Sequence, residues 1–228
     1  NIEKTKEVIL YLTEVRVALA KIASSNNLKV EFEKVVTRIT YGANKVEVSC
    51  RDGSVYRAKK VVCSLPLGVL KSGKVCFEPQ LPPAYLESIG RLGVALMNKI
   101  IVAFEENFWG SMSWISVGCN ERGRFSQIYN FSQKGKHILC CFITDDFARK
   151  VEPLPDEELL GEFVALLGRL FKKEGIKVTD YAITRWGLDE FSLGSYTSFH
   201  VGSSPDDSYR LRKPVGDTLW IVGEHCYP

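Results

Sequence analysis

The side chains with the clearest chemical potential are one lysine and three aromatic residues. Lys99 lies at the start of an apolar run, and Trp186, Phe191 and Tyr196 follow one another at intervals of five residues in a Gly-containing loop. A buried ammonium group can stabilise negative charge that develops during a reaction. An aromatic slot excludes water and binds an amine through apolar and cation–π contacts. The residue types alone leave the ordinary alternatives open, since a strand-end lysine commonly reaches solvent and aromatic residues commonly pack in the core.

Acidic residues in two later loops are candidates for attracting a cationic substrate. Asp189 and Glu190 lie in the first of these loops, and Asp206 and Asp207 lie in the second. Charged loop residues are usually only solvated, and we expect the same of these four carboxylates.

The composition is that of an ordinary globular protein and excludes several classes of function. Hydrophobic residues make up 45% of the 228 residues, charged residues make up 25%, and the net charge is +3. Basic and acidic residues are interleaved, so there is no basic stripe for nucleic acid. No apolar run approaches the roughly 20 residues of a membrane helix, and no secretory signal pattern is visible. The histidines and cysteines have no metal-site spacing, and most cysteines lie in apolar runs, which predicts buried thiols in a reducing compartment.

Hydrophobic periodicity predicts a mixture of helices and strands without strict alternation. Helices are expected at residues 11–24, 84–89 and 157–173, the last with Asp156 as its cap. Strands are expected at 28–32, 35–41, 45–50, 54–65, 99–104, 178–186 and 219–223, with three more within 113–147 that include a hairpin of 124–131 and 137–144. The strands before Pro66 form an antiparallel meander. These patterns predict an α/β (α+β) protein and leave its function open.

Five segments in order carry a resemblance to a known family. They are CSLPLGVLK (63–71), LGVALMNKIIVAF (92–104), NFW (107–109), TRWGLDEFSLGSY (184–196) and IVGEHCYP (221–228). Together they resemble the flavin-containing amine oxidases, and more closely the polyamine oxidases and lysine-specific histone demethylases than the monoamine oxidases. The resemblance extends over nearly the whole chain from about Tyr11 onward.

The resemblance implies the FAD-binding two-domain fold of these amine oxidases. Residues 1–74 would belong mostly to the FAD-binding domain, 75–180 to the substrate-binding domain, and 181–228 to the FAD-binding domain again. The sequence contains no G-x-G-x-x-G after a strand, the turn through which such folds approach the pyrophosphate. The family's segment after the GEH motif is also absent. We therefore expect a fragment that is inactive by itself and does not hold FAD tightly.

The same resemblance implies roles for individual residues. Lys99 matches the lysine that holds a water against flavin N5, and Tyr196 would form one wall of the aromatic slot; these are the expected catalytic residues. Phe191 stands where most relatives carry Trp or Tyr. The expected cofactor contacts are Val36 (through its backbone to adenine), Pro66 and Leu67 (along the flavin), Trp186 and Phe191 (beside the isoalloxazine), and Gly223 and Glu224 (near the ribityl and phosphate groups). No metal site is expected.

The function that the resemblance implies is an FAD-dependent oxidase, which converts a secondary or N-methylated amine to an imine and releases hydrogen peroxide. Its partner would be a cationic amine, either a polyamine or a methylated lysine of a histone tail, with no direct binding of nucleic acid or membrane. The expected compartment is intracellular: the nucleus for a histone demethylase, the cytoplasm or peroxisome for a polyamine oxidase. The alternative is a catalytically silent relative that acts as a binding or scaffold module.

Overall fold

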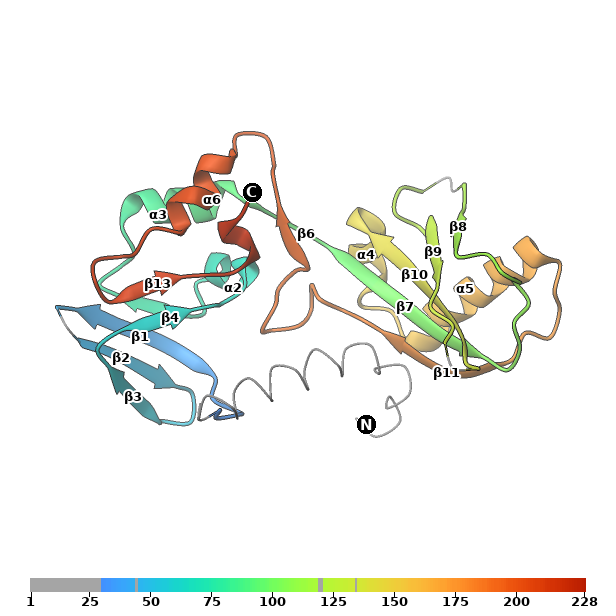
Figure 1. The fold of residues 1–228 in the computed structure, drawn as a ribbon, viewed down its shortest axis with the longest axis horizontal. Helices are drawn as coiled ribbons and strands as arrows, with labels where there is room; N and C mark the ends of the chain where they lie inside the picture. Colours follow the sequence, from blue (N-terminus) through green and yellow to red (C-terminus); the bar gives the residue numbers. More distant parts are fainter. Residues whose placement is uncertain (1–29, 44, 119–120, 134) are drawn as a thin grey trace. The chain divides into compact units, whose positions relative to one another are not determined.

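The computed structural model describes residues 30–43, 45–118, 121–133 and 135–228. The helix predicted at 11–24 lies outside them. The described chain forms two compact units (Figure 1), named here by their order in the sequence. The central unit is Leu96–Arg185, and the flanking unit combines Glu31–Ala95 with Trp186–Pro228. The units divide after Ala95 and after Arg185, since the segment 76–95 pairs and packs within the flanking unit and residues 178–183 pair within the central unit. The expected domain boundaries after residues 74 and 180 stay a prediction. Which unit binds flavin and which binds substrate stays a prediction.

The larger sheet of the flanking unit contains the predicted meander. Its strands are β1 (Val36–Gly42), β2 (Lys45–Cys50), β3 (Val55–Ala58) and β5 (Cys76–Glu78), in the order β3-β2-β1-β5. The antiparallel pairing of the first three strands is confirmed, and β5 runs parallel to β1. In β1, Ile39 and Tyr41 are buried and their neighbours are not, as expected for a sheet with one face on the core.

Two of the predicted strands near the meander were wrong. Residues 30–32 of the strand predicted at 28–32 are not in a strand. Residues 54–65 form two strands rather than one, because β4 (Val61–Cys63) leaves the meander and pairs in parallel with β13 (Leu219–Ile221). The apolar run that ends before Pro66 therefore contacts the far end of the chain.

Short helices complete the flanking unit. They are α2 (Leu67–Ser72), α3 (Pro83–Arg91), α6 (Pro205–Leu211) and the 3-10 turn η1 (Glu224–Cys226), and the strands β6 (Gly93–Ala95) and β12 (Tyr196–Ser198) pair antiparallel beside them. One apolar core, which includes Leu81, Leu92, Leu211 and Ile221, joins these elements to the sheets. The helix predicted at 84–89 is confirmed as α3, whereas α2 and α6 are too short to show a helical period.

The ammonium group of Lys71 closes the carboxyl end of α3. Its Nζ donates to the carbonyl oxygens of Ile89, Gly90 and Leu92 at 2.7, 2.8 and 2.8 Å. Carbonyls at a helix end lack intrahelical partners, and a cation there also opposes the negative end of the helix dipole. Lys71 thus ties the segment after Pro66 to α3.

Replacement of Lys71 by methionine should lower the free energy of unfolding by about 1–2 kcal/mol, because three charge-assisted hydrogen bonds are lost while the apolar stem is kept. Urea denaturation measures the change. Lys59→Met, at an exposed position between β3 and β4, is the matched control. Equal stability of the two variants would contradict the capping role.

The central unit is built on one antiparallel sheet. Its strands are β7 (Met97–Phe104), β8 (Trp114–Ser116), β9 (Gln127–Asn130), β10 (His137–Thr144) and β11 (Val178–Ile183), in the order β11-β7-β10-β9-β8. The predicted hairpin of 124–131 and 137–144 is confirmed by the pairing of β9 with β10. Every second residue of β7 is buried, beginning with Asn98, so Lys99 lies on the opposite face of the sheet.

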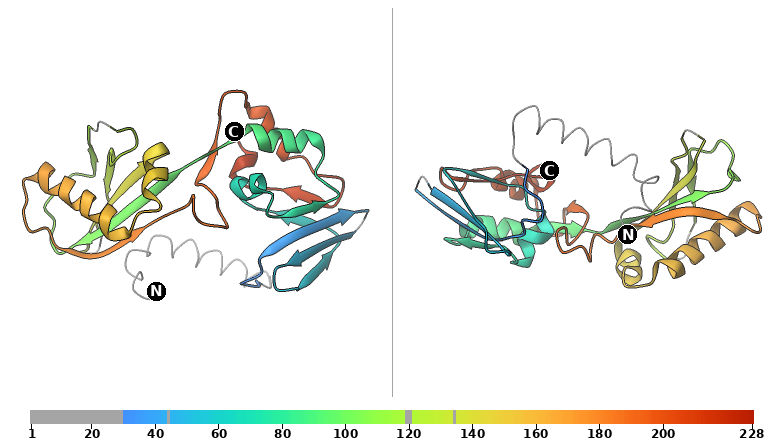
Figure 2. Two further views of the ribbon diagram at one scale, coloured as in Figure 1. Left: turned by 180° about the vertical axis from the view of Figure 1, so that it is seen from behind. Right: turned by 90° about the horizontal axis from the view of Figure 1, so that it is seen from below.

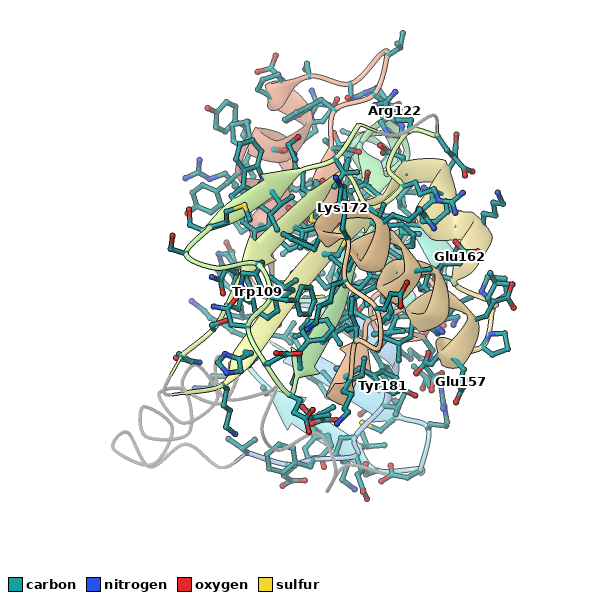
Figure 3. The ribbon with its side chains drawn as sticks, turned by 90° about the vertical axis from the view of Figure 1, so that its right-hand side faces the viewer. Trp109, Arg122, Glu157, Glu162, Lys172 and Tyr181 are labelled. Carbon is teal, nitrogen blue, oxygen red and sulfur yellow. The ribbon has the colours of Figure 1, made fainter. Side chains whose placement is uncertain are left out.

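Two helices cover one face of this sheet. They are α4 (Asp145–Val151), which periodicity did not predict, and α5 (Asp156–Phe171), which it did. Figures 2 and 3 show α5 lying along the strands, and its buried Leu159, Phe163 and Leu167 join the core formed by β7 and β10. No helix in the described ranges is long and apolar enough to span a bilayer.

The predicted cap of α5 was wrong. Pro155 occupies the N-cap position, and Asp156 lies inside the first turn. The Asp156 carboxylate instead accepts a hydrogen bond from Arg185 Nη2 at 2.5 Å. The helix ends at Phe171, since Lys172 adopts a left-handed conformation with φ of 48°.

The described cysteines are free thiols, and most of them are buried as predicted: Cys50, Cys63, Cys140, Cys141 and Cys226, with Cys76 exposed. Burial raises the pKa of Cys140 to about 12, although Lys99 opposes the shift. Such thiols are inert packing groups at neutral pH.

Candidate functional site

The loop from Trp186 to Tyr196 is held in a defined shape by its own backbone. Gly194 N donates to Trp186 O at 2.8 Å, and Leu193 N donates to Asp189 O at 2.9 Å. Gly194 has φ of 141°, and a Cβ there would lie 2.0 Å from Val94 Cγ1, so only glycine fits. The loop is therefore fixed against β6 in the flanking unit.

The three aromatic residues of this loop are exposed rather than part of the core. Trp186, Phe191 and Tyr196 keep 36%, 53% and 43% of their surface accessible. Exposed aromatic side chains on a rigid loop favour a binding role over core packing. Tyr196 is further fixed because it begins β12 and pairs with Ala95.

The acidic residues of the two candidate loops have structural partners. The Asp189 carboxylate accepts a hydrogen bond from Phe191 N at 2.8 Å, and Glu190 forms an ion pair with Arg51 at 3.1 Å. The expectation of a solvated side chain is wrong for Asp207, which is 2% exposed. Its carboxylate lies between α3 and α6, where Arg91 and Ser88 donate to it. Asp206 is exposed, as expected.

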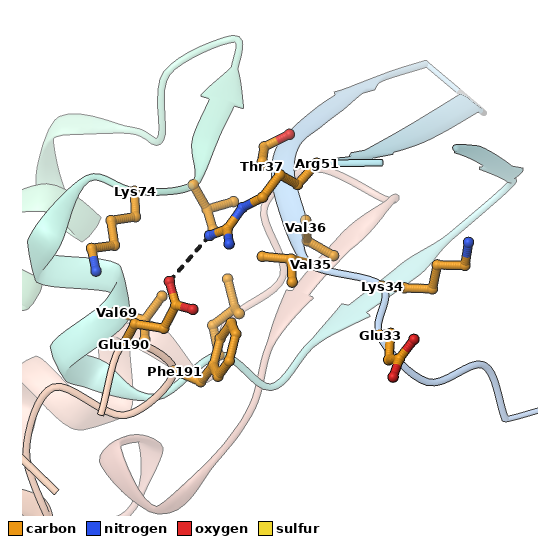
Figure 4. Close-up of a pocket in the computed structure, with 12 residues that line it drawn as sticks. Glu33, Lys34, Val35, Val36, Thr37, Arg51, Val69, Lys74, Glu190 and Phe191 are labelled. Carbon is orange, nitrogen blue, oxygen red and sulfur yellow. Dashed lines mark hydrogen bonds and ion pairs between the residues drawn. The ribbon is translucent and has the colours of Figure 1, made fainter. Parts of the chain in front are cut away.

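A cavity of about 320 Å³ opens in the flanking unit beside this loop (Figure 4). Val36, Leu65 and Phe191 form part of its lining, so the structure brings two of the predicted cofactor contacts, Val36 and Phe191, to one cavity. Its size is within the range of small-molecule sites, about 300–1,000 Å³. The apolar walls suit a flat ring system. The charged side chains at its border are of both signs, and two of the cations are paired, Lys34 with Asp52 and Arg51 with Glu190.

Glu224 links two of the sequence motifs. Its carboxylate accepts hydrogen bonds from Thr197 N at 3.1 Å and from Thr197 Oγ1 at 2.8 Å. Thr197 follows Tyr196 directly, so the end of the TRWGLDEFSLGSY segment (184–196) and the IVGEHCYP segment (221–228) meet in the flanking unit. Gly223, with φ of 144°, leaves space for the ring of the buried His225, and burial lowers the pKa of that histidine.

Pro66 and Leu67 begin α2 next to the cavity. Pro66 occupies the N-cap position, and the Leu67 side chain is 2% exposed in the core. Any contact from Leu67 to a cofactor would therefore come from its backbone. The next residue, Gly68, contacts the aromatic loop: a Cβ there would lie 2.4 Å from Leu193 O and 2.5 Å from Ser192 O.

Replacement of Gly68 by alanine should lower the free energy of unfolding by about 2–3 kcal/mol, because neither carbonyl can retreat without a shift of the loop backbone. The measurements are urea denaturation and limited proteolysis within residues 186–196. Gly90→Ala is the control, and it should raise the free energy of unfolding slightly. A Cβ at this position in α3 meets nothing within 4 Å, and alanine favours helix over glycine. If Gly68→Ala were as stable as the parent, the close contact would be refuted.

Lys99 lies on the face of the central sheet away from α4 and α5. Its side chain is partly buried, and Nζ lies 5.7 Å from the ring centroid of Phe142, the residue of β10 that pairs with Lys99. The Phe142 ring in turn lies 5.0 Å from that of Tyr129 on β9. Sequence reasoning missed both aromatic residues, because only the strand register places them beside Lys99.

Lys99 belongs to the central unit and Tyr196 to the flanking unit, and their convergence on one flavin edge stays a prediction. The roles predicted for Val36, Pro66, Leu67, Trp186, Phe191, Gly223 and Glu224 also stay predictions. Among the described residues, no group of His, Cys, Asp and Glu side chains is arranged to hold a metal ion.

Comparisons with known proteins agree on one family. The family described as flavin containing amine oxidoreductase matches residues 5–228. Lysine-specific histone demethylase 1 homolog 3 of Oryza sativa subsp. japonica is 35% identical over 209 residues, which cover 88% of this chain and 26% of that protein. Polyamine oxidase 7 of the same rice is 30% identical over 224 residues, which cover 96% of this chain and 47% of that protein.

The fold is also found among solved structures. A structure of wild-type putrescine oxidase bound to putrescine aligns with a TM-score of 0.70 at 20% identity, over 84% of this chain and 44% of that one. The chain thus spans less than half the length of the relatives it matches. The family resemblance, the amine oxidase fold and the flavin cofactor of the family, all predicted from the sequence, are confirmed. The chain belongs to the flavin-containing amine oxidoreductases.

Proposed function

We propose that the intact protein is an FAD-dependent oxidase of secondary or N-methylated amines. In this reaction the carbon next to nitrogen loses a hydride, the resulting imine is hydrolysed, and oxygen is reduced to hydrogen peroxide. The flavin, when bound, supplies the hydride acceptor and passes the electrons to oxygen. The protein then has to bind the amine, orient it and exclude water.

The residues that would hold the cofactor lie in the flanking unit. Val36 and Phe191 line one cavity of about 320 Å³ there, which would take one end of the FAD: either the adenine expected at Val36 or the isoalloxazine expected at Phe191. Pro66 and Leu67 would contribute backbone groups at the start of α2. Trp186 would contact the ring system, and Gly223 and Glu224 would contact the ribityl and phosphate region through the turn that also binds Thr197.

Lys99 and Tyr196 would act on the reacting groups. The ammonium group of Lys99 would hold a water and stabilise negative charge near the reaction centre. The ring of Tyr196, exposed on a rigid strand, would form one wall of a slot that binds the amine by apolar and cation–π contact.

The observation that carries this proposal is the construction of the aromatic loop. Three exposed aromatic side chains lie on one loop that glycine contacts fix in place. The loop lines the Val36 cavity, and the next residue, Thr197, contacts Glu224. Rigidly held, exposed aromatic residues can serve a binding module as well as an enzyme, but the cavity beside them is a feature of small-molecule sites. The loop and the cavity together therefore support the enzyme.

A substrate panel on the full-length protein tests the proposal. Spermine, N-acetylated polyamines and a methylated histone peptide are added without oxygen, and flavin absorbance is followed; peroxide is then measured in air. We expect bleaching and peroxide with one class of amine and none with the unmethylated peptide, which is the matched control. A preparation that holds flavin but responds to no amine would overturn the proposed activity. The substrate class would also indicate the compartment, nuclear for histone and cytoplasmic or peroxisomal for polyamines.

A further inference from the structure

A chain of polar groups links the backbone of Lys99 to the corner between α4 and α5. Lys99 N donates to Thr184 Oγ1 at 2.8 Å, and this hydroxyl donates to Asn98 Oδ1 at 3.2 Å. Asn98 Nδ2 then donates to Glu152 Oε1 at 2.7 Å. Asn98 is 0% exposed and Glu152, at the end of α4, is 5% exposed. The hydrogen bonds run in one direction: Thr184 and Asn98 each accept one hydrogen bond and donate the next.

The position of Thr184 explains why a hydroxyl is used. The last paired residues of β11 and β7 are Ile183 and Ile100, and Thr184 lies opposite Lys99 just beyond them. Thr184 N still donates to Lys99 O at 3.0 Å, but the Lys99 amide donates to the Thr184 side chain. The hydroxyl thus keeps the Lys99 amide bonded at the point where the chain turns away to leave the central unit after Arg185.

A second tether holds the same strand end. Arg185 Nη2 donates to Leu154 O at 2.8 Å and to Asp156 Oδ1 at 2.5 Å. Both acceptors lie at the corner between the two helices. Thr184 and Arg185 therefore fix the end of β11, and Asn98 fixes the start of β7, to one rigid element on the helix side of the sheet.

Alternation along β7 places the Lys99 side chain on the opposite face from this network. Its Nζ lies over Phe142, so the ammonium position depends on where the strand holds the Lys99 backbone. The network is not explained by stability alone, because replacing both partners of a buried hydrogen bond with apolar groups of the same shape can leave the free energy of unfolding unchanged. A buried polar network does supply a single fixed geometry.

From these contacts we infer that Thr184 and Asn98 are positioning residues for Lys99, which hold its backbone so that the ammonium group keeps one location. The inference rests on the proposed role of Lys99 in amine oxidation. Neither residue would touch substrate, and both would act through the lysine.

The test uses the full-length flavoprotein with the variants Thr184→Val, Thr184→Ser and, as matched control in the strand that precedes Thr184, the exposed Thr179→Val. Each is made in the parent and in a Lys99→Met background. We expect Thr184→Val to lower kcat about tenfold with little change in KM, since a small displacement of a catalytic group is costly. Thr184→Ser, which keeps the hydroxyl, should restore most of the rate, and Thr179→Val should have no effect.

The double variant separates positioning from a general loss of structure. If Thr184 acts through Lys99, Thr184→Val causes no further loss in the Lys99→Met background. An equal loss in both backgrounds would overturn the inference and leave the proposed function intact.

The chemical reactivity of Lys99 tests its position independently of catalysis. The acetylation rate of Lys99 by acetic anhydride, followed by mass spectrometry, should rise about threefold in Thr184→Val and stay unchanged in Thr184→Ser. If Lys99→Met oxidised amines as fast as the parent, the proposed role of Lys99 would fail. The acetylation rate alone would then show whether Thr184 positions Lys99. An unchanged rate in Thr184→Val would refute it.

Discussion

Replacement of Lys99 by methionine in the intact flavoprotein should lower the rate of amine oxidation by about a hundredfold, with KM nearly unchanged. Methionine keeps much of the length and apolar character of the stem and removes the charge. Lys99 is partly buried beside Phe142, where a positive charge is less screened than on an open surface. The expected loss is therefore in the chemical step or in the reaction with oxygen, which stopped-flow absorbance of the flavin separates.

Two further variants sharpen this prediction. Lys60→Met is the matched control, since Lys60 also lies over an aromatic ring, 5.1 Å from the centroid of Trp220, and has no proposed role. Lys99→Arg keeps the charge but changes the donor geometry, so an intermediate rate is expected. Rates in Lys99→Met that equal those of Lys60→Met would remove Lys99 from the mechanism.

Replacement of Asp207 by asparagine should lower the free energy of unfolding by about 3 kcal/mol, because Arg91 and Ser88 lose a buried anionic partner. Arg91 Nη2 and Nε lie 2.5 and 2.9 Å from Asp207 Oδ1. Ser204 N donates to the other carboxylate oxygen at 3.1 Å. These bonds join α3 to α6, so the loss should loosen the flanking unit.

The pH dependence gives this prediction a second test. The Arg91 guanidinium lowers the pKa of Asp207 to about 2, below the value of about 3.9 for an unfolded chain. The stabilisation is thus fully present above about pH 4 and is lost as the pH falls towards about 2. Urea denaturation should show this loss in the parent and in the exposed neighbour variant Asp206→Asn, but not in Asp207→Asn. The same acid sensitivity in all three proteins would contradict the assignment.

Local patterns were sufficient for the elements with a clear period. The apolar stripe of α5 and the alternation of β1 and β7 follow from burial of one face, whereas β10 is a continuous buried run; each was predicted within a few residues. The split of 54–65 into β3 and β4 was not visible, because it depends on pairing with β13, far away in the sequence. The helix α6 did carry a local signal, Ser204 followed by Pro205 and, three residues after the serine, Asp207, which periodicity over seven residues could not reveal.

The candidate site divides in the same way. Lys99 and the three aromatic residues could be selected from residue type, spacing and family resemblance, since their motifs are continuous in the sequence. The contacts that fix them could not be selected so, because Thr184, Asn98 and Glu152 meet only through strand register and a helix corner. For the same reason Asp207 was expected in solvent and lies buried against α3.

The most direct test of the central claim is an experimental structure of the intact protein with FAD and an amine analogue bound. We expect the Lys99 ammonium group to reach flavin N5 through one water and the Tyr196 ring to border the same edge, with the amine between them. A structure in which Lys99 and Tyr196 face different regions, with no space for a substrate between them, would contradict it.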